Sequence, residues 1–164
     1  MGRQKSRGAL EQDMLYRFLV KAIERHLDEF GPFIDQFDDK ILHSEPLNDG
    51  KPFGEVVYHM LRSFEFYTRG ITEGVWEPAP FKYDAFTDTV SFQTLWQELY
   101  TRVTTRLALI SLSDLSREIG EFNRRATVGE ILLEMLEHSI HHRGQLTVYL
   151  RLLGTEPAKI EYII

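Results

Sequence analysis

Residues 127–154 read TVGEILLEMLEHSIHHRGQLTVYLRLLG, and this stretch carries the signals of one long helix. A capping box starts it, because the Thr127 side chain can cap the backbone of Glu130 while the Glu130 carboxylate bonds back. Gly154 is a helix terminator, and Pro157 follows just beyond. Steps of three and four residues place one seam of side chains on one face: Val128, Ile131, Met135, His138, His142, Gln145, Tyr149 and Leu152. We predict a helix to Leu153 whose seam faces a protein core.

Three further segments have helical periodicity. The first is Ala9–Phe30, which we expect to stop at the Gly-Pro pair that follows it. The second is Pro52–Arg69, with Gly70 near its C-cap. The third is Phe92–Leu109, for which Ser91 is the expected N-cap.

The connections between these segments are rich in Gly, Pro and aromatic residues. A helical turn is expected near Ile34–Leu42. Residues 74–90, GVWEPAPFKYDAFTDTV, look like a packed loop, and residues 123–130, NRRATVGE, leave a short strand and an irregular segment both open. Because alternating βαβ patterns are absent, four long helices joined by loops predict an all-α, antiparallel four-helix bundle.

The chain has the length and composition of one globular domain. Its 164 residues are 43% hydrophobic and 27% charged, values that fit a packed core rather than a disordered chain. No repeat, low-complexity tract or linker divides it, so we expect a single domain over residues 1–164. Residues 1–8 contain basic side chains ahead of the first helical segment, which predicts a flexible basic arm.

Charge and composition exclude several classes of protein. The formal net charge is −6 at pH 7, which argues against a protein that binds nucleic acid by neutralising its phosphates. No apolar run reaches the length of a membrane span, so we expect no membrane contact of that kind. There is no cysteine, which rules out disulfides, thiolate metal ligands and a cysteine nucleophile. A reducing, cytoplasmic location is the natural expectation for such a chain.

The histidines are the side chains best suited to carry chemistry, because imidazole titrates near neutrality and binds transition metals. His138 and His142 lie one turn apart on the seam, about 40° from each other, whereas His141 points about 100° away from His142. A transition metal with an open position usually takes three protein ligands, so a third ligand must come from another helix. His59, in the middle of the second helical segment, is the best-placed donor.

Spacing alone leaves two interpretations of these histidines open. Histidines four residues apart in a helix are often exposed or hydrogen-bonded within a core. Buried imidazoles without a partner are costly, however, which favours a bound metal on an apolar seam. His26 lies near the end of the first helical segment and His43 lies in a connection, so both are worse placed for the bundle interior than His59.

Residues 137–154, EHSIHHRGQLTVYLRLLG, resemble the last helix of the DinB-like superfamily, also called YfiT-like metal-dependent proteins. In that family H-x-x-x-H-R-G-Q is followed by an apolar helix and a Gly stop. Residues 127–136, TVGEILLEML, resemble the start of the same helix. Residues 53–71, FGEVVYHMLRSFEFYTRGI, resemble the second helix with its single histidine. The resemblance covers residues 9–153, and its most specific part is the HRGQ segment.

The resemblance implies a four-helix bundle with an up-down-down-up connection and a three-histidine site for a divalent metal. His59 matches the ligand on the second helix, and His138 and His142 match the pair on the last. Zinc or nickel is the expected metal, and iron also suits imidazole ligands. Relatives include thiol-dependent transferases and isomerases and some hydrolases, so we expect a metal-dependent enzyme with a small-molecule substrate. A low-molecular-weight thiol, where one is used, must come from a cofactor or the substrate, because the chain has no cysteine.

Neighbours of the three histidines are candidates for supporting roles. Gly144 would permit a close helix approach where a side chain would clash. Arg143 and Gln145 would orient the ligands, although a surface salt bridge is an equally good interpretation of Arg143. Glu55 and Glu134 each lie one turn before a histidine, but no residue stands out as the catalytic base.

Other catalytic centres lack their motifs in this chain. There is no Glu-x-x-His for a di-iron centre, no H-E-x-x-H for a zinc protease, no G-x-S-x-G elbow and no glycine-rich nucleotide motif.

The non-catalytic alternative is a dimeric helical scaffold. The last helix has a second apolar set on its other side: Leu133, Leu136, Ile140 and Leu150. A helix that is apolar on two sides is either deeply buried or faces a partner, which predicts a C2 homodimer. In such a scaffold the metal would be structural and closed by a fourth ligand, so open versus closed coordination distinguishes the two functions.

Overall fold

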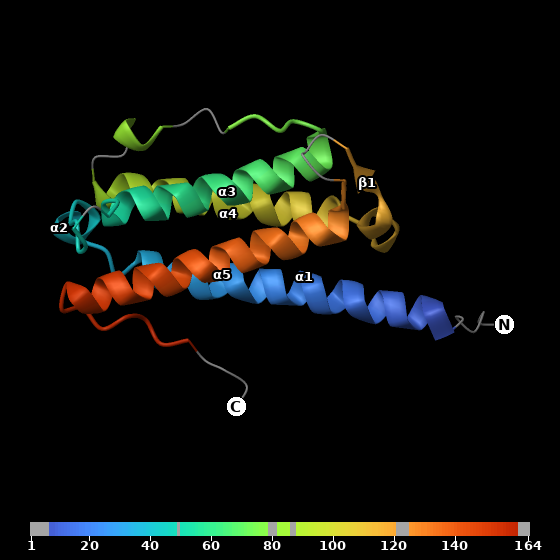
Figure 1. Cartoon of the computed structure of the whole chain (residues 1–164), viewed down its shortest axis with the longest axis horizontal. Helices are drawn as coiled ribbons and strands as arrows, with labels where there is room; N and C mark the ends of the chain where they lie inside the picture. The colour runs from blue at the N-terminus through green and yellow to red at the C-terminus, as the bar shows by residue number, and fades with distance from the viewer. Residues whose placement is uncertain (1–6, 49, 79–81, 86–87, 121–124, 161–164) are drawn as a thin grey trace.

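Four long helices lie side by side along one axis (Figure 1). The computed structural model describes residues 7–48, 50–78, 82–85, 88–120 and 125–160. The long helices are α1 (Arg7–Ile34), α3 (Phe53–Glu73), α4 (Thr89–Leu109) and α5 (Val128–Leu152). Helices α1 and α5 run in one direction and α3 and α4 in the other, as the colours in Figure 1 show. The all-α, four-helix bundle with up-down-down-up topology is therefore confirmed.

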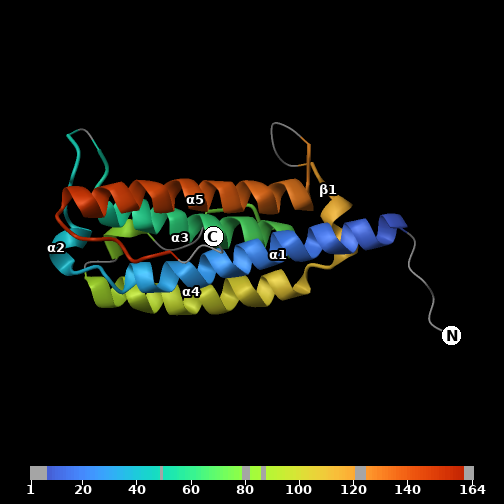
Figure 2. The ribbon, with the colours of Figure 1, turned by 90° about the horizontal axis from the view of Figure 1, so that it is seen from below.

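The four helices close into a ring around one core. Helix α3 packs against α4 and α5, and α1 packs against the same two helices; Figure 2 shows α5 and α4 on opposite sides of the bundle. Aromatic side chains from three of these helices fill the middle and are fully buried: Phe30, Phe33, Phe53, Phe64 and Phe92. Large aromatic groups contribute most of the area that such a core removes from water.

Helix α1 is longer than the sequence pattern predicts. It passes through Gly31 and Pro32 and ends at Ile34, so the expected stop at Phe30 is wrong. Proline in a helix costs about 3 kcal/mol, but the two residues beyond it, Phe33 and Ile34, are buried in the core. Burial of two such side chains is worth roughly 3–6 kcal/mol, which offsets the proline.

Two further helix boundaries differ from the predicted ones. Helix α3 continues past Gly70 to Glu73, and its C-cap is Gly74, which has the left-handed conformation with φ of 71°. Gly70 lies inside the helix, where a side chain would clash with the ring of Trp76. Helix α4 begins earlier than expected, because the Asp88 side chain, not Ser91, accepts the capping hydrogen bond, from the backbone N–H of Ser91.

The signals at both ends of α5 are confirmed. Thr127 and Glu130 form the reciprocal capping box, and Gly154 follows the helix with a φ of 79°. The predicted seam is buried or partly buried except at Leu152, which is 55% exposed. Of the second apolar set, Leu136 and Leu150 are buried in the core of this chain, so they are not available to a partner as the scaffold interpretation assumed.

The shorter elements lie at the two ends of the bundle. Helix α2 (Asp39–Leu42) is the helical turn predicted between α1 and α3. The 3₁₀ helices η1 (Tyr83–Ala85) and η2 (Leu112–Ser116) lie in the connections. Strand β1 (Glu118–Ile119) pairs antiparallel with β2 (Ala126–Thr127), Glu118 opposite Thr127. The segment before α5 thus holds a short strand, the first of the two options that its sequence left open.

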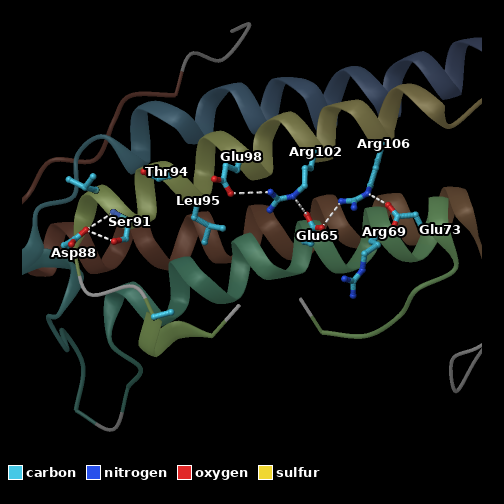
Figure 3. A pocket seen from close by; sticks show the side chains of 12 residues that line it. Glu65, Arg69, Glu73, Asp88, Ser91, Thr94, Leu95, Glu98, Arg102 and Arg106 are labelled. Carbon is cyan, nitrogen blue, oxygen red and sulfur yellow. Dashed lines mark hydrogen bonds and ion pairs between the residues drawn. The ribbon is translucent and has the colours of Figure 1, made fainter. Parts of the chain in front are cut away.

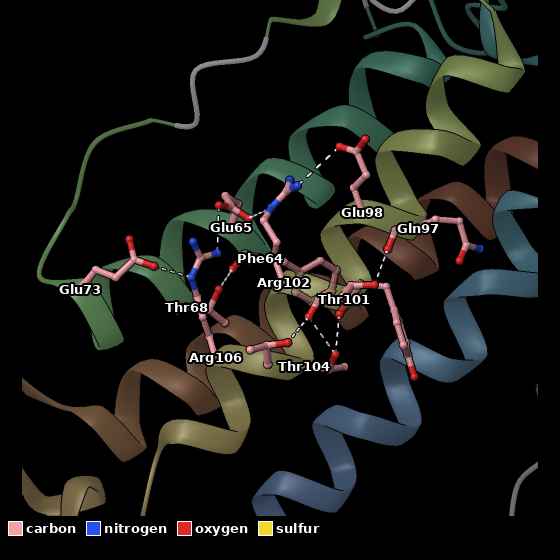
Figure 4. A network of polar contacts seen from close by, with 12 residues as sticks. Phe64, Glu65, Thr68, Glu73, Gln97, Glu98, Thr101, Arg102, Thr104 and Arg106 are labelled. Carbon is pink, nitrogen blue, oxygen red and sulfur yellow. Dashed lines mark hydrogen bonds and ion pairs between the residues drawn. The ribbon is translucent and has the colours of Figure 1, made fainter.

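A buried carboxylate joins α3 to α4 (Figure 4). Glu65 is 6% exposed and lies between Arg102 and Arg106, with the Glu65 carboxylate 2.9 Å from Arg106 Nη1 and 3.2 Å from Arg102 Nε. Glu73 and Glu98 pair with the same two arginines. This network lines a cavity of about 870 Å³ (Figure 3). Since its charges are paired with one another, the network serves to hold two parallel helices together.

Within the described residues, no helix is long and apolar enough to cross a membrane. Of the predicted basic arm, residues 1–6 lie outside the described residues, while Arg7 and Gly8 already belong to α1.

Candidate metal centre

Three histidines from two helices meet at the contact between α3 and α5. The Nε2 atom of His138 lies 3.2 Å from the Nε2 atom of His59 and 3.2 Å from that of His142. One ring nitrogen from each of the three residues falls within 4.8 Å of the others. The structure therefore brings together the three residues that the sequence singled out, from positions 79 and 83 residues apart from His59 along the chain.

Helical geometry explains the convergence. His138 and His142 occupy successive turns of α5 on its buried seam, and their ring centroids lie 4.5 Å apart. Helix α3 packs directly on α5 and supplies His59, whose ring lies 5.1 Å from His138 and 4.9 Å from His142. All three side chains are partly buried.

The spacing of the nitrogens fits a bound transition metal. Zinc binds histidine nitrogen at about 2.0–2.1 Å with tetrahedral angles, so two ligating nitrogens lie about 3.3 Å apart. Both measured Nε2 separations are 3.2 Å. A neutral imidazole has a single N–H, so His138 Nε2 cannot satisfy both of its neighbours through hydrogen bonds. One cation between the three lone pairs would satisfy all of them.

A hydrogen-bonded chain fixes the ring of His142. Its Nδ1 atom lies 3.0 Å from the Gln145 side-chain oxygen, and the Gln145 amide donates to the Tyr149 hydroxyl at 3.2 Å. When Nδ1 donates to Gln145, Nε2 keeps its lone pair free to face the other histidines. Gln145 is thus placed to orient the ring of His142.

The surroundings keep two of the imidazoles uncharged. Burial lowers the pKa of His138 to about 4, with further contributions from His142 and His59. Burial also lowers the pKa of His59, and His142 and Arg62 add to this effect. Only the neutral form of imidazole offers a lone pair, so both residues are ready to bind a metal at neutral pH.

A small pocket opens beside the histidines. It has a volume of about 230 Å³ and is lined by His59, Arg62, Ser63, Phe66, Tyr67, Pro78 and His138. The Tyr67 hydroxyl donates to the Glu134 carboxylate at 3.2 Å, and burial followed by the nearby Glu134 charge raises the pKa of Tyr67 to about 12. Tyr67 is therefore protonated over the physiological range, and its ring lies 6.4 Å from that of His138.

Two residues of this pocket were missed in the sequence, although the signal was present. Arg62 lies three residues after His59 on α3, and Tyr67 lies eight residues after it. Positions at these spacings are on the same side of a helix. The position of His59 alone thus indicates which residues of α3 flank the site.

The remaining histidines lie elsewhere. His141 and His43 are exposed, as expected from the sequence. His26, which was expected to be poorly placed for the interior, is in fact 3% exposed. Its Nε2 atom is hydrogen-bonded to the hydroxyl of Ser139 on α5. The prediction fails because α1 extends a full turn beyond its expected end, so His26 lies well inside the bundle.

Several supporting roles are also corrected. Gly144 is exposed, and a side chain there would meet nothing within 4 Å, so it does not mediate a close helix contact. Arg143 is buried and forms an ion pair with Glu29 of α1 at 2.6 Å, so neither ligand orientation nor a surface salt bridge describes it. Glu55 pairs with Lys51, which lies just before the start of α3.

Comparisons with known proteins give a consistent family and fold. A family model described as the DinB family matches residues 12–164. The uncharacterised protein YjoA of Bacillus subtilis (strain 168) is 34% identical over 104 residues, which make up 61% of this chain and 66% of YjoA. The match thus spans about two thirds of that relative's length.

Solved structures share the bundle. A DinB-like protein, YjoA from Bacillus subtilis, has a TM-score of 0.74 at 24% identity, covering 90% of this chain and 99% of its own. A DinB-like protein from Bacillus cereus has a TM-score of 0.73 at 20% identity, covering 87% and 95%. YfiT from Bacillus subtilis, described as a probable metal-dependent hydrolase with an unusual four-helix bundle topology, has a TM-score of 0.62 at 18% identity, covering 95% and 94%. These similarities establish the fold.

Proposed function

The chain belongs to the DinB family, and on that premise we propose that it is a metal-dependent enzyme acting on a small molecule. The divalent ion, zinc or nickel, is held by His59, His138 and His142. The observation that carries the proposal is the convergence of three imidazole nitrogens, two pairs of which are separated by 3.2 Å. The description of YfiT as a probable metal-dependent hydrolase supports the same class of activity.

An open site is favoured over a structural one. Among the described residues, the group of side chains that could hold a metal contains the three histidines and no fourth ligand. The pocket beside them leaves space for a substrate. A bound metal would supply a Lewis acid that polarises a carbonyl or lowers the pKa of a water molecule or a thiol.

Other residues of the site orient the ligands and provide apolar surface for a substrate. Gln145 holds the His142 ring in one tautomer. Phe66 and Tyr67 supply ring surface that can pack against an apolar part of a substrate. A hydrolase and a thiol-dependent transferase both fit this arrangement. In the second case the thiol belongs to a small cofactor or the substrate, because the chain has no cysteine.

Activity tests decide between these functions. Zinc-loaded and nickel-loaded protein would be assayed for hydrolysis of 4-nitrophenyl acetate and for transfer of a small thiol to 1-chloro-2,4-dinitrobenzene. We expect one of these rates to fall to background in His138→Ala and after treatment with a chelator, and to return in the parent when metal is restored. A rate that survives both treatments would show that the metal is not catalytic.

A separate measurement tests whether the coordination is open. Cobalt(II)-loaded protein would be titrated with azide while the visible absorption of the metal is followed. An open site predicts new absorption bands as azide binds. An unchanged spectrum would indicate a site closed by a fourth ligand, and the scaffold function would then be the better account.

We also propose that the protein forms a C2 homodimer. Leu10, Met14 and Phe18 are spaced four residues apart on α1 and are each more than half exposed. Monomeric proteins rarely expose a continuous apolar stripe of this kind. A self-complementary contact between two copies would cover it.

A further inference from the structure

Arg62 is held beside the three histidines by the geometry of α3. It follows His59 by three residues, and side chains at that spacing lie about 5–6 Å apart at Cβ. Both residues line the same pocket. Arg62 is partly buried.

Other arginines that are buried or partly buried in the bundle have partners, and Arg69 donates to the backbone carbonyl of Glu77. Arg106 pairs with Glu65 and Glu73, and Arg143 pairs with Glu29. Arg62, by contrast, forms neither an ion pair nor a hydrogen bond with any residue that the structure describes. A partly desolvated guanidinium without a counter-charge is unfavourable. The described residues supply no negatively charged partner for Arg62, so a bound anion would stabilise it.

The nearby carboxylates are engaged with other groups. Glu55 pairs with Lys51 one turn before His59. Glu134 accepts the hydrogen bond of the Tyr67 hydroxyl. The polar lining of the pocket therefore presents a positive charge, while its acidic neighbours bind other side chains.

Resting on the metal site proposed above, we propose that the pocket selects small substrates that carry a carboxylate, which Arg62 binds while the reacting end faces the histidines. The planar guanidinium matches a carboxylate with two parallel hydrogen bonds, which a lysine or an amide cannot reproduce. Phe66 and Tyr67 line the same pocket, where their rings would contact the short apolar link of such a substrate. Arg62 is then a specificity-determining residue.

Two thiols of the same chain length, one ending in a carboxylate and the other in a hydroxyl, test this inference. Zinc-loaded protein would be titrated by calorimetry with 3-mercaptopropionate and with 3-mercapto-1-propanol, whose thiols both can bind the metal. Only the first carries a carboxylate. The variants are Arg62→Gln and, as a control with the same change of charge, Arg17→Gln, which alters a side chain that is 73% exposed on α1. Circular dichroism and zinc content would be recorded for each protein.

We expect the parent and Arg17→Gln to bind 3-mercaptopropionate about tenfold to hundredfold more tightly than the alcohol. In Arg62→Gln the two thiols should bind equally while the zinc content is unchanged. If the zinc-loaded parent binds the two thiols equally, Arg62 does not select the carboxylate. The same conclusion follows if Arg62→Gln keeps the preference for 3-mercaptopropionate. Either result would overturn the role of Arg62 without contradicting the proposed metal site. Failure of the parent to bind zinc would instead overturn the proposed metal site itself.

Discussion

His26 illustrates how a single buried side chain depends on the length of its helix. The sequence placed it near a helix end, whereas the structure buries it against Ser139, with the Arg143–Glu29 ion pair nearby. Burial, then the charges of Arg143 and Arg25, lowers the pKa of His26 to about 3. A neutral imidazole is therefore built into the contact between α1 and α5.

This residue predicts a loss of stability in mild acid. The folded protein keeps His26 neutral, whereas the unfolded chain binds a proton near pH 6.5, so the contribution is present above that pH and is lost as the pH falls. Between pH 7.5 and 5.5 the free energy of unfolding should fall by about 1.4 kcal/mol on account of His26 alone. Urea unfolding of metal-free parent and His26→Gln at both pH values measures this difference. Equal pH slopes in the two proteins would contradict it.

The three candidate metal ligands were predictable at the same scale. His138 and His142 follow from helical spacing and His59 from its position in the middle of the second helical segment, and the family resemblance points to the same three residues. Arg62 and Tyr67 were not predicted, although their spacing from His59 places them on the same side of α3. Only the packing of α3 on α5 encloses them in a pocket.

At the level of elements, capping residues, glycine and proline predict helix ends correctly where burial in the core does not oppose them. Both ends of α5 follow from its capping box and its terminal glycine. The end of α1 does not, because the burial of Phe33 and Ile34 outweighs the cost of Pro32. Helix propensity depends on neighbouring residues in the sequence, whereas burial depends on the whole fold. A helix boundary that is set by burial in the core can therefore be missed from sequence alone.

Two helical glycines give a matched test of these contacts. A Cβ at Gly70 would lie 2.2 Å from a ring atom of Trp76, whereas one at Gly144 would have nothing within 4 Å. Gly144→Ala should raise the free energy of unfolding by about 0.5–1 kcal/mol through helix propensity. Gly70→Ala should lower it and shift the tryptophan fluorescence to longer wavelength as Trp76 is displaced. If both substitutions stabilise the protein, the packing of Trp76 does not depend on the absence of a side chain at Gly70.

At the scale of the whole molecule, the fold class follows from the four periodic segments, but the order of the helices does not. Helices α3 and α4 run in the same direction (Figure 1). Four helical segments joined by loops predicted an antiparallel bundle, in which neighbouring helices alternate in direction. The up-down-down-up order came from the family resemblance, and the Glu65 network stabilises this less common arrangement.

The proposed homodimer is tested on the exposed stripe of α1. Phe18→Glu places a charge at a side chain that is 72% exposed, and Val90→Glu does the same at one that is 68% exposed on α4. Light scattering after gel filtration should show a dimer for the parent and Val90→Glu, and a monomer for Phe18→Glu. A monomeric parent at high concentration would refute the dimer, and a dimeric Phe18→Glu would place the interface elsewhere.

The three-histidine centre is tested most directly by the metal content of protein purified without a histidine tag. The parent would be analysed beside His142→Ala and beside His141→Ala, which removes an adjacent but exposed histidine. We predict about one equivalent of metal in the parent and in His141→Ala, and its loss in His142→Ala, because two imidazoles no longer form a site. Absence of metal from the parent, even after incubation with zinc and nickel, would contradict the account and leave the three histidines as side chains of the helix contact.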